Sequence, residues 1–167
     1  GGALEVDEDG HLLSTAQCLL NPERNGDMSL GAYEDAFKDM LGCSKVTVLQ
    51  NGHLEGDDTD GHIDTIVRFT PNKGLVIQAC NNRPNDSHFE GLKALCDECA
   101  LELPEHKQFH LPLPYIVNDE GDRLPASYAN YLICNKSILL PVYGEEEDAE
   151  AIETVQQAHP DHIVEPI

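Results

Sequence analysis

The chain reads I-D-T-I-V-R-F-T-P-N-K-G-L-V-I-Q-A from residue 63 to residue 79, and its architecture can be traced outward from there. The β-branched and aromatic residues of Ile63 to Phe69 predict a strand, and Leu75 to Ala79 predicts a second one. Pro71-Asn72-Lys73-Gly74 between them is typical of a tight turn. The sequence therefore predicts a β-hairpin.

A helix and a short strand follow this hairpin, and the same order occurs before it. We predict the helix over Ser87 to Leu101 and the strand over Phe109 to Leu113. Upstream, strands at Ala3 to Val6 and His11 to Thr15 are joined by a turn at Asp9-Gly10, and a polar loop at Asn21 to Asp27 follows. A helix then begins after its cap Ser29 and ends at Gly42, and its apolar face consists of Leu30, Tyr33, Phe37, Met40 and Leu41. A buried strand at Lys45 to Leu49 completes this unit.

A third copy of this order completes the chain. Its elements are strands at Ala129 to Cys134 and Ser137 to Val142 around a turn at Asn135-Lys136, a helix near Asp148 to Ala158 with an apolar stripe of Ala149, Ile152 and Val155, and a strand at Ile163 to Glu165. Strand–strand–helix–strand thus occurs three times at a period of roughly sixty residues, which indicates a radial or stacked α/β array. We place the units at approximately residues 1–50, 62–114 and 127–167 of a single partial domain. The alternative, a doubly wound sheet, alternates single strands with helices and does not use such hairpins.

The composition limits the partners that the protein can have. The 167 residues include 10 Lys and Arg against 31 Asp and Glu, a formal net charge of −21. This charge repels phosphate backbones and argues against nucleic acid as a partner, while it favours cationic ligands. A solubilising or salt-adapted surface is the alternative explanation. Since the sequence has neither a membrane-length apolar run nor a basic leader, we expect a soluble, cytoplasmic protein without membrane contact.

Cysteine spacing gives one weak metal or redox signal. Cys96 and Cys99 form a C-D-E-C pair, but no second pair lies at zinc-site spacing. The pair falls in line with Phe89, Leu92 and Leu95 of the predicted helix. We therefore interpret it as a core-facing thiol pair, and we predict neither a metal nor a cofactor.

The segment G-D-D-T-D-G-H-I-D at residues 56–64 concentrates the chemistry. His62 and Asp64 lie two apart on a segment predicted to be extended, so their side chains should project to the same side. Together they could supply a proton shuttle and an anion that binds a cation. Asp58-x-Asp60-Gly61 also resembles part of a calcium loop, although the downstream Glu of that motif is missing. A solvated acidic turn without a function is the third interpretation.

The segment G-D-D-T-D-G-H-I-D-T also resembles the core motif of the agmatine deiminase and bacterial (Porphyromonas-type) peptidylarginine deiminase family. Three further segments resemble this family in the same order: G-G-A-L-E-V-D at residues 1–7, S-T-A-Q-C-L-L-N-P-E-R-N at 14–25 and R-L-P-A-S-Y-A-N-Y at 123–131. The resemblance implies the pentein fold, a five-bladed α/β propeller of ββαβ units. The three units predicted above would be three of those five.

The resemblance also implies a mechanism. In this family a cysteine thiolate attacks the guanidinium carbon, ammonia leaves, and water hydrolyses the covalent thiouronium intermediate. By this resemblance His62 would be the general acid and base, and Asp64 would be a catalytic residue that pairs with guanidinium nitrogens. The other residues carried over are Asn130 close to the site, Asp58 and Asp60 at the border of the substrate pocket, and Arg24 and Asn25, for which an architectural role is at least equally plausible.

The nucleophile is the main departure from the family. Relatives carry it near the C-terminus in a segment that resembles G-G-N-I-H-C, and none of the six cysteines has this surrounding. We therefore expect an incomplete enzyme that is inactive alone, with unpaired unit faces that favour self-association into a homo-oligomer. Agmatine suits the acidic loops as the small cationic guanidine substrate, with arginine side chains of proteins as the close alternative. Two alternatives to an enzyme stay open: a catalytically inactive pentein-like module that binds cations, and an acidic structural module without a ligand.

Overall fold

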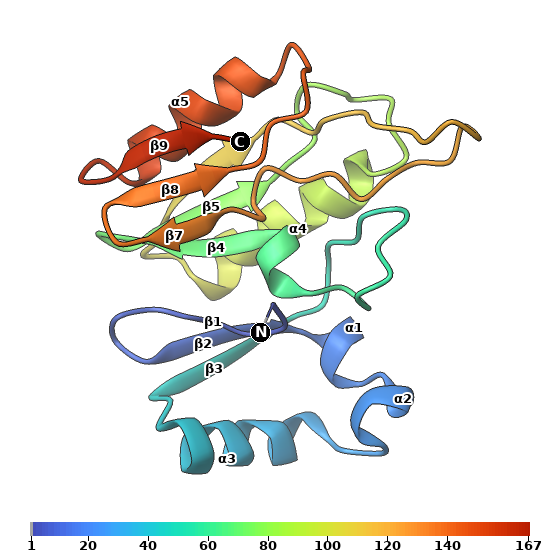
Figure 1. Ribbon diagram of the computed structural model, residues 1–167. Coiled ribbons are helices and arrows are strands. Elements are labelled where there is room, and N and C mark those ends of the chain that lie inside the picture. Colours follow the sequence, from blue (N-terminus) through green and yellow to red (C-terminus); the bar gives the residue numbers. More distant parts are fainter. Residues whose placement is uncertain (1) are drawn as a thin grey trace.

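The computed structural model describes residues 2–167 and contains three small sheets, each with one long helix (Figure 1). The first unit comprises β1 (Glu5–Val6), β2 (His11–Thr15), α3 (Leu30–Leu41) and β3 (Lys45–Leu49). The second comprises β4 (Val67–Thr70), β5 (Gly74–Gln78), α4 (Phe89–Glu102) and β6 (Lys107–Leu111). The third comprises β7 (Leu132–Cys134), β8 (Ser137–Leu140), α5 (Asp148–Ala158) and β9 (Ile163–Pro166). The predicted order of elements is therefore confirmed in all three units.

The three sheets share one pairing pattern. The first two strands form an antiparallel hairpin, with Val67 opposite Ile77 in the second unit. The third strand pairs in parallel with the second, which is why a helix must cross between them. All three hairpin turns lie at the left of Figure 1, and the loop that contains residues 50–62 lies at the right. The separate sheets show that the doubly wound alternative is wrong.

Two predicted strands begin three or more residues later than expected. Ile63–Thr65 forms a 3₁₀-helix, η1, because Ile66 N donates to Ile63 O at 3.0 Å and Thr65 Oγ1 donates to His62 O at 2.8 Å. Because these local bonds take the place of hydrogen bonds to a neighbouring strand, β4 begins only at Val67. The strand predicted from Ala129 begins only at Leu132, because the carbonyls of residues 129 and 131 accept hydrogen bonds from a side chain.

The predicted polar loop at Asn21 to Asp27 contains a short helix, α2 (Pro22–Asn25), and another short helix, α1 (Ala16–Leu19), precedes it. Thr15 caps α1 through its side-chain oxygen, which accepts from Cys18 N at 3.1 Å. Asn21 caps α2 in the same way, and Pro22 occupies the first helical position, where its missing N–H costs nothing. Composition predicted the loop, whereas local capping bonds produce the helices.

The predicted bounds of α3 are confirmed, but its predicted apolar face is only partly buried. Ser29 accepts from Ala32 N at 3.3 Å, and Gly42 ends the helix at φ +71°. Met40 and Leu41 are 82% and 56% exposed. In the other units the helix also packs on the preceding sheet, α4 on β3 and α5 on β5 and β6. Within the described residues α3 has no preceding sheet to cover.

Strand β5 lies at the centre of the core. Leu75 and Ile77 point into one apolar cluster shared with the first sheet, and Val76 points into another shared with the third unit. This alternation follows from the two-residue period of a strand and makes β5 buried on both faces. The stripe of α5 that contacts the second cluster consists of Ala151, Val155 and Ala158, with Ile152 at its edge; Ala149, predicted to belong to it, is exposed.

The C-D-E-C pair belongs to the core, as predicted. Cys99 is fully buried, and Cys96 packs partly against the same cluster. Burial raises the pKa of the two thiols to about 12 and about 11, and both are free. Over residues 2–167, no group of three or more His, Cys, Asp or Glu side chains could hold a metal ion. The helices of this part of the chain are also too short or too polar to cross a membrane.

Candidate active site

The acidic loop that begins at Gly56 is organised around Asp57. Its carboxylate accepts hydrogen bonds from Thr59 N at 2.9 Å, Thr59 Oγ1 at 2.5 Å and Gly61 N at 2.8 Å. Burial opposes ionisation of Asp57, but these bonds lower its pKa below the usual value. Asp57 is therefore an internal brace of the loop, and the neighbouring Asp58 is exposed. No calcium ligand set is assembled by the residues that the structure describes.

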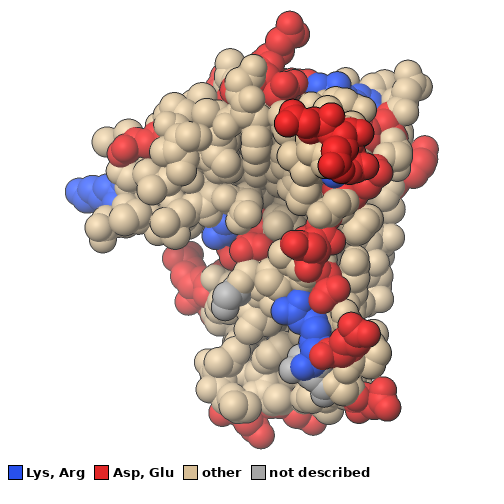
Figure 2. Space-filling view, turned by 45° about the vertical axis from the view of Figure 1, so that its right-hand side comes forward, with Lys and Arg blue, Asp and Glu red and all other residues tan. Residues whose placement is uncertain are grey.

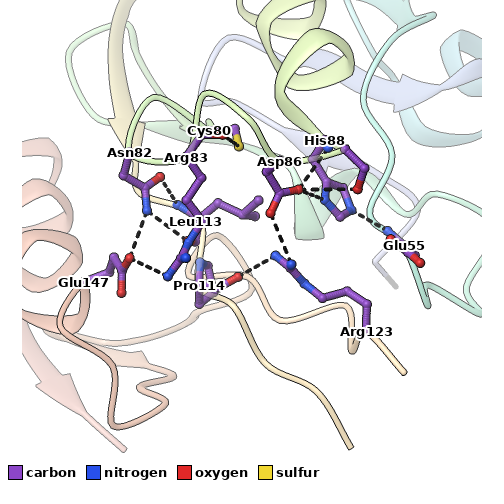
Figure 3. A network of polar contacts seen from close by, with 11 residues as sticks. Glu55, Cys80, Asn82, Arg83, Asp86, His88, Leu113, Pro114, Arg123 and Glu147 are labelled. Atoms are coloured by element: carbon purple, nitrogen blue, oxygen red, sulfur yellow. Dashed lines mark hydrogen bonds and ion pairs between the residues drawn. The ribbon is translucent and has the colours of Figure 1, made fainter. Parts of the chain in front are cut away.

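A buried polar network supports the start of this loop (Figure 3). Glu55 N donates to His88 Nε2 at 2.8 Å, and the other ring nitrogen contacts Asp86 Oδ1 at 2.7 Å. Arg123 Nη1 donates to Asp86 Oδ2 at 3.2 Å. A side chain at Gly56 would meet the carbonyl oxygen of Arg123 at 2.5 Å. Asp86 thus connects the acidic loop to the segment that leads to Asn130.

We expect Asp86→Asn to remove part of the acid sensitivity of folding. Burial alone would raise the pKa of Asp86, but hydrogen bonds from His88 and the charge of Arg123 lower it to about 2. Because the folded-state pKa lies below the unfolded value, the ionised carboxylate stabilises the fold above about pH 4 and ceases to do so as pH falls towards 2. The contribution is about 2 kcal/mol. Urea unfolding at pH 5 and pH 2 measures it; Asp35→Asn, on exposed α3 surface, is the control and should keep the wild-type pH dependence.

His62 immediately precedes η1, and Asp64 is its middle residue. The extended conformation predicted for this segment is wrong, but both side chains are half-buried. Burial raises the pKa of Asp64, while the charges of Arg68 and His62 act in the opposite direction. Asp64 is thus a partly desolvated carboxylate beside an imidazole. Such a carboxylate gains more from a cationic ligand than a fully hydrated one does.

Gly2 lies directly against Asp64. Asp64 N donates to Gly2 O at 3.2 Å. A Cβ atom added at Gly2 would lie 2.3 Å from Asp64 Oδ2 and 2.7 Å from Oδ1. The glycine therefore leaves the space that the carboxylate occupies. Gly1, its neighbour in the same sequence motif, lies outside the described residues.

We expect Gly2→Ala to displace the Asp64 carboxylate and to lower by about 10²-fold the kcat/KM of any reaction that depends on the position of this carboxylate, the effect of an ångström-scale misplacement. Gly31→Ala is the matched control, because no atom lies within 4 Å of its added Cβ and helix α3 gains propensity. Steady-state kinetics and thermal unfolding of both variants separate misplacement from instability. Equal kinetics for the two variants would contradict this role of Gly2.

Arg24 of α2 contacts the other end of the loop. Its Nη1 donates to Thr59 O at 2.7 Å and to Asp60 Oδ2 at 3.3 Å, and its Nη2 lies 3.2 Å from His62 Nε2. Asp60, at φ +63°, is therefore paired with Arg24. Thr15 Oγ1 donates to Gly61 O at 2.6 Å on the same side. The sequence motif pointed to Arg24, but no local pattern predicted that it touches His62.

Asn130 follows a turn that is fixed to η1. Ser127 Oγ donates to Thr65 O at 2.6 Å and lies 3.0 Å from Gln78 Oε1, which also accepts from Tyr128 N. Asn130 itself is exposed. The structure thus brings its segment to the loop of His62, although the two are far apart in the sequence.

Arg68 of the second unit forms hydrogen bonds with residues of the first and third units. Its Nε donates to Glu5 Oε2 at 3.0 Å, and its Nη1 donates to Tyr131 O at 2.7 Å and to Ala129 O at 3.2 Å. The guanidinium carbon lies 4.7 Å from the centre of the Tyr131 ring. Burial raises the pKa of Glu5, while the charge of Arg68 lowers it. Arg68 therefore fixes the β1, β4 and β7 ends of the three units relative to one another.

The thiol beside the loop is not activated. Cys18 lies in α1, next to the Thr15 contact with Gly61, and burial raises the pKa of its thiol. A cysteine nucleophile needs a lowered pKa so that the thiolate is populated. Figure 2 shows that Asp and Glu outnumber Lys and Arg on the visible face, so the surroundings favour cations. The site can thus bind a cation and exchange a proton.

The chain resembles known proteins over its whole length. Residues 1–167 match the family described as Porphyromonas-type peptidyl-arginine deiminase. The chain is 32% identical to the "Putative agmatine deiminase" of Mycoplasma mycoides over 100% of its own length and 51% of that protein's length. It is 41% identical, with a TM-score of 0.93, to the "Putative Arginine Deiminase from Porphyromonas gingivalis", covering 100% of this chain and 50% of that one. A C. jejuni agmatine deiminase variant with substrate bound has a TM-score of 0.92 at 29% identity, covering 100% of this chain and 49% of that one. The chain thus spans about half the length of these proteins and shares their pentein architecture.

Proposed function

Because the chain belongs to the Porphyromonas-type peptidyl-arginine deiminase family, we propose that it forms part of a guanidine-group hydrolase that converts agmatine to N-carbamoylputrescine and ammonia. One observation carries the proposal. The four segments that resemble the family in sequence meet at a single loop, where Gly2, Thr15, Arg24 and Ser127 all contact residues 59–65. This convergence surrounds His62 and Asp64. The 167 residues are, in this proposal, one portion of a pentein domain.

The roles follow from the groups present. Asp64 pairs with guanidinium nitrogens of the substrate and orients the carbon for attack. His62 protonates the departing ammonia and then takes a proton from the water that hydrolyses the covalent intermediate. Asn130, Asp58 and Asp60 border the substrate, with Asp60 held by Arg24.

We place the nucleophile outside these 167 residues. The thiol of Cys18 has a raised pKa, as have those of Cys80, Cys96 and Cys99. Relatives have about twice the length of this chain, so their further residues offer room for a cysteine segment. The chain alone should therefore bind agmatine without releasing ammonia.

Agmatine is the favoured substrate, and the arginine side chain of a protein is the second candidate. The amine of agmatine suits the acidic surface in Figure 2, and the Mycoplasma mycoides relative carries the name "Putative agmatine deiminase". The family description instead refers to peptidyl-arginine. Both substrates present the same guanidinium to Asp64. A cytoplasmic location and a homo-oligomer stay predictions.

The test is ammonia release by the full-length gene product from agmatine, from free arginine and from an arginine-containing peptide. We expect turnover of agmatine above the other two. Turnover of the peptide alone would replace agmatine by the second candidate. Absence of turnover from all three, together with agmatine binding seen by calorimetry, would favour a binding module of the same fold.

A further inference from the structure

Arg24 has a contact that the proposed roles do not use. Its guanidinium donates through one nitrogen to the backbone of the acidic loop, at Thr59 O, and through the other to the imidazole of His62, at Nε2. The residues are 38 positions apart in the sequence. The side chain of Arg24 is only 32% exposed although α2 lies at the surface. Arg24 thus contacts both the backbone of the acidic loop, at Thr59, and the candidate acid/base residue, His62.

Both partners of this contact are held independently. Asn21 Oδ1 accepts from Glu23 N at 2.9 Å and fixes the start of α2. On the loop side, Thr15 Oγ1 holds Gly61 O at 2.6 Å. The backbones that carry the two side chains are therefore held in place on either side of the contact.

The contact determines where the proton of neutral His62 lies. An Arg guanidinium carries only donors and stays protonated in proteins. Nε2 of His62 must therefore be the acceptor, and the proton of the neutral ring must be on Nδ1. Free neutral histidine in water mainly carries its proton on Nε2 instead. The contact thus selects the less common tautomer.

We propose that Arg24 is a positioning residue for His62, which it holds in the Nδ1–H tautomer with the Nε2 lone pair in a fixed direction. The catalytic meaning of this rests on the proposed function. The only ring lone pair of neutral His62 is on Nε2 and accepts from Arg24, so a proton can be taken up there only when this contact opens. Once Nε2 takes up a proton, it is an N–H donor that faces the N–H donor of Arg24. The two groups then repel each other and the contact breaks. Arg24 therefore orients His62 while His62 is neutral and stops doing so once His62 is protonated.

The tautomer is measurable in the 167-residue chain without any activity. Two-bond ¹H–¹⁵N correlation spectra at alkaline pH distinguish the two tautomers of a histidine by the shifts of its ring nitrogens. We expect the Nδ1–H form for His62 in the wild type and the Nε2–H form in Arg24→Met. Lys38→Met is the matched control, because it removes one positive charge from the same unit at a side chain that is 45% exposed and, among the described residues, pairs only with Glu34 in the preceding turn. The wild-type Nε2–H form, or an unchanged tautomer in Arg24→Met, would overturn the proposal.

A second variant covers the case in which Arg24→Met does not fold. Arg24→Gln keeps a polar side chain at this place, but its amide can accept as well as donate, so it no longer excludes the Nε2–H form and that fraction should rise. If the wild-type gene product does not turn over agmatine, the proposed function fails, while the spectra still decide the role of Arg24.

Discussion

Replacing Arg68 with methionine should destabilise the chain by about 3–5 kcal/mol, the usual effect of removing one partner from a buried ion pair. Arg68 and Glu5 are 13% and 14% exposed, so the remaining carboxylate would be left without a counter-charge in a poorly hydrated position. The carbonyls of Ala129 and Tyr131 would also lose their donor. Because these groups belong to three different units, the loss affects the junction of the units and no single sheet. Urea unfolding of the purified chain measures the effect.

Two further variants isolate the cause. Lys73→Met removes the same charge from the exposed pair with Glu105, whose side chains are 56% and 75% exposed, and should leave the urea midpoint close to that of the wild type. The double variant Glu5→Gln with Arg68→Met leaves no buried charge and should be more stable than Arg68→Met alone. If Arg68→Met cost no more than Lys73→Met, the ion pair would not hold the three units together.

The repeat of the fold could be predicted because short-range chemistry encodes it. The hairpin turn at Pro71 to Gly74 and the cap pair Ser29 and Gly42 act within a few residues, and the structure confirms these features. The exposure of Met40 and Leu41 could not be predicted in the same way. An apolar helical stripe indicates that a helix has a face to cover, but whether a sheet lies there depends on how the units stack.

The candidate site shows the same division between local and distant information. His62 and Asp64 were found from their chemistry and from a family motif, and the structure places both in half-buried positions. The contact of Arg24 with His62 and the space that Gly2 leaves for Asp64 are products of packing across 38 and 62 positions of the sequence, respectively, so no periodicity encodes them. From the sequence alone, Arg24 and Gly2 are members of a motif without an explained role. The distances from Arg24 to His62 and from Gly2 to Asp64 are needed to assign their roles.

Replacing His62 with alanine should lower kcat of the full-length gene product for agmatine by about 10²–10⁴-fold, the contribution of a positioned general acid and base. Agmatine binding should change little, because Asp64 and the acidic surroundings that attract the cation remain. Ammonia release and calorimetric titration measure the two quantities. His53→Ala is the matched control: His53 is exposed and precedes the same loop, so the variant removes an imidazole close to the site without touching its contacts.

Because turnover and binding are measured separately, His62→Ala distinguishes an enzyme from a module that only binds cations. An enzyme that uses His62 for proton transfer loses turnover while it keeps its affinity, whereas a module that only captures cations has no turnover to lose and keeps its affinity as well. Asp64→Asn should give the opposite pattern, with weakened agmatine binding, because it removes the charge that pairs with the guanidinium. If His62→Ala kept wild-type turnover while Asp64→Asn lost it, proton transfer would have to come from another group. The contact between Arg24 and His62 would then serve only to hold the loop over α2.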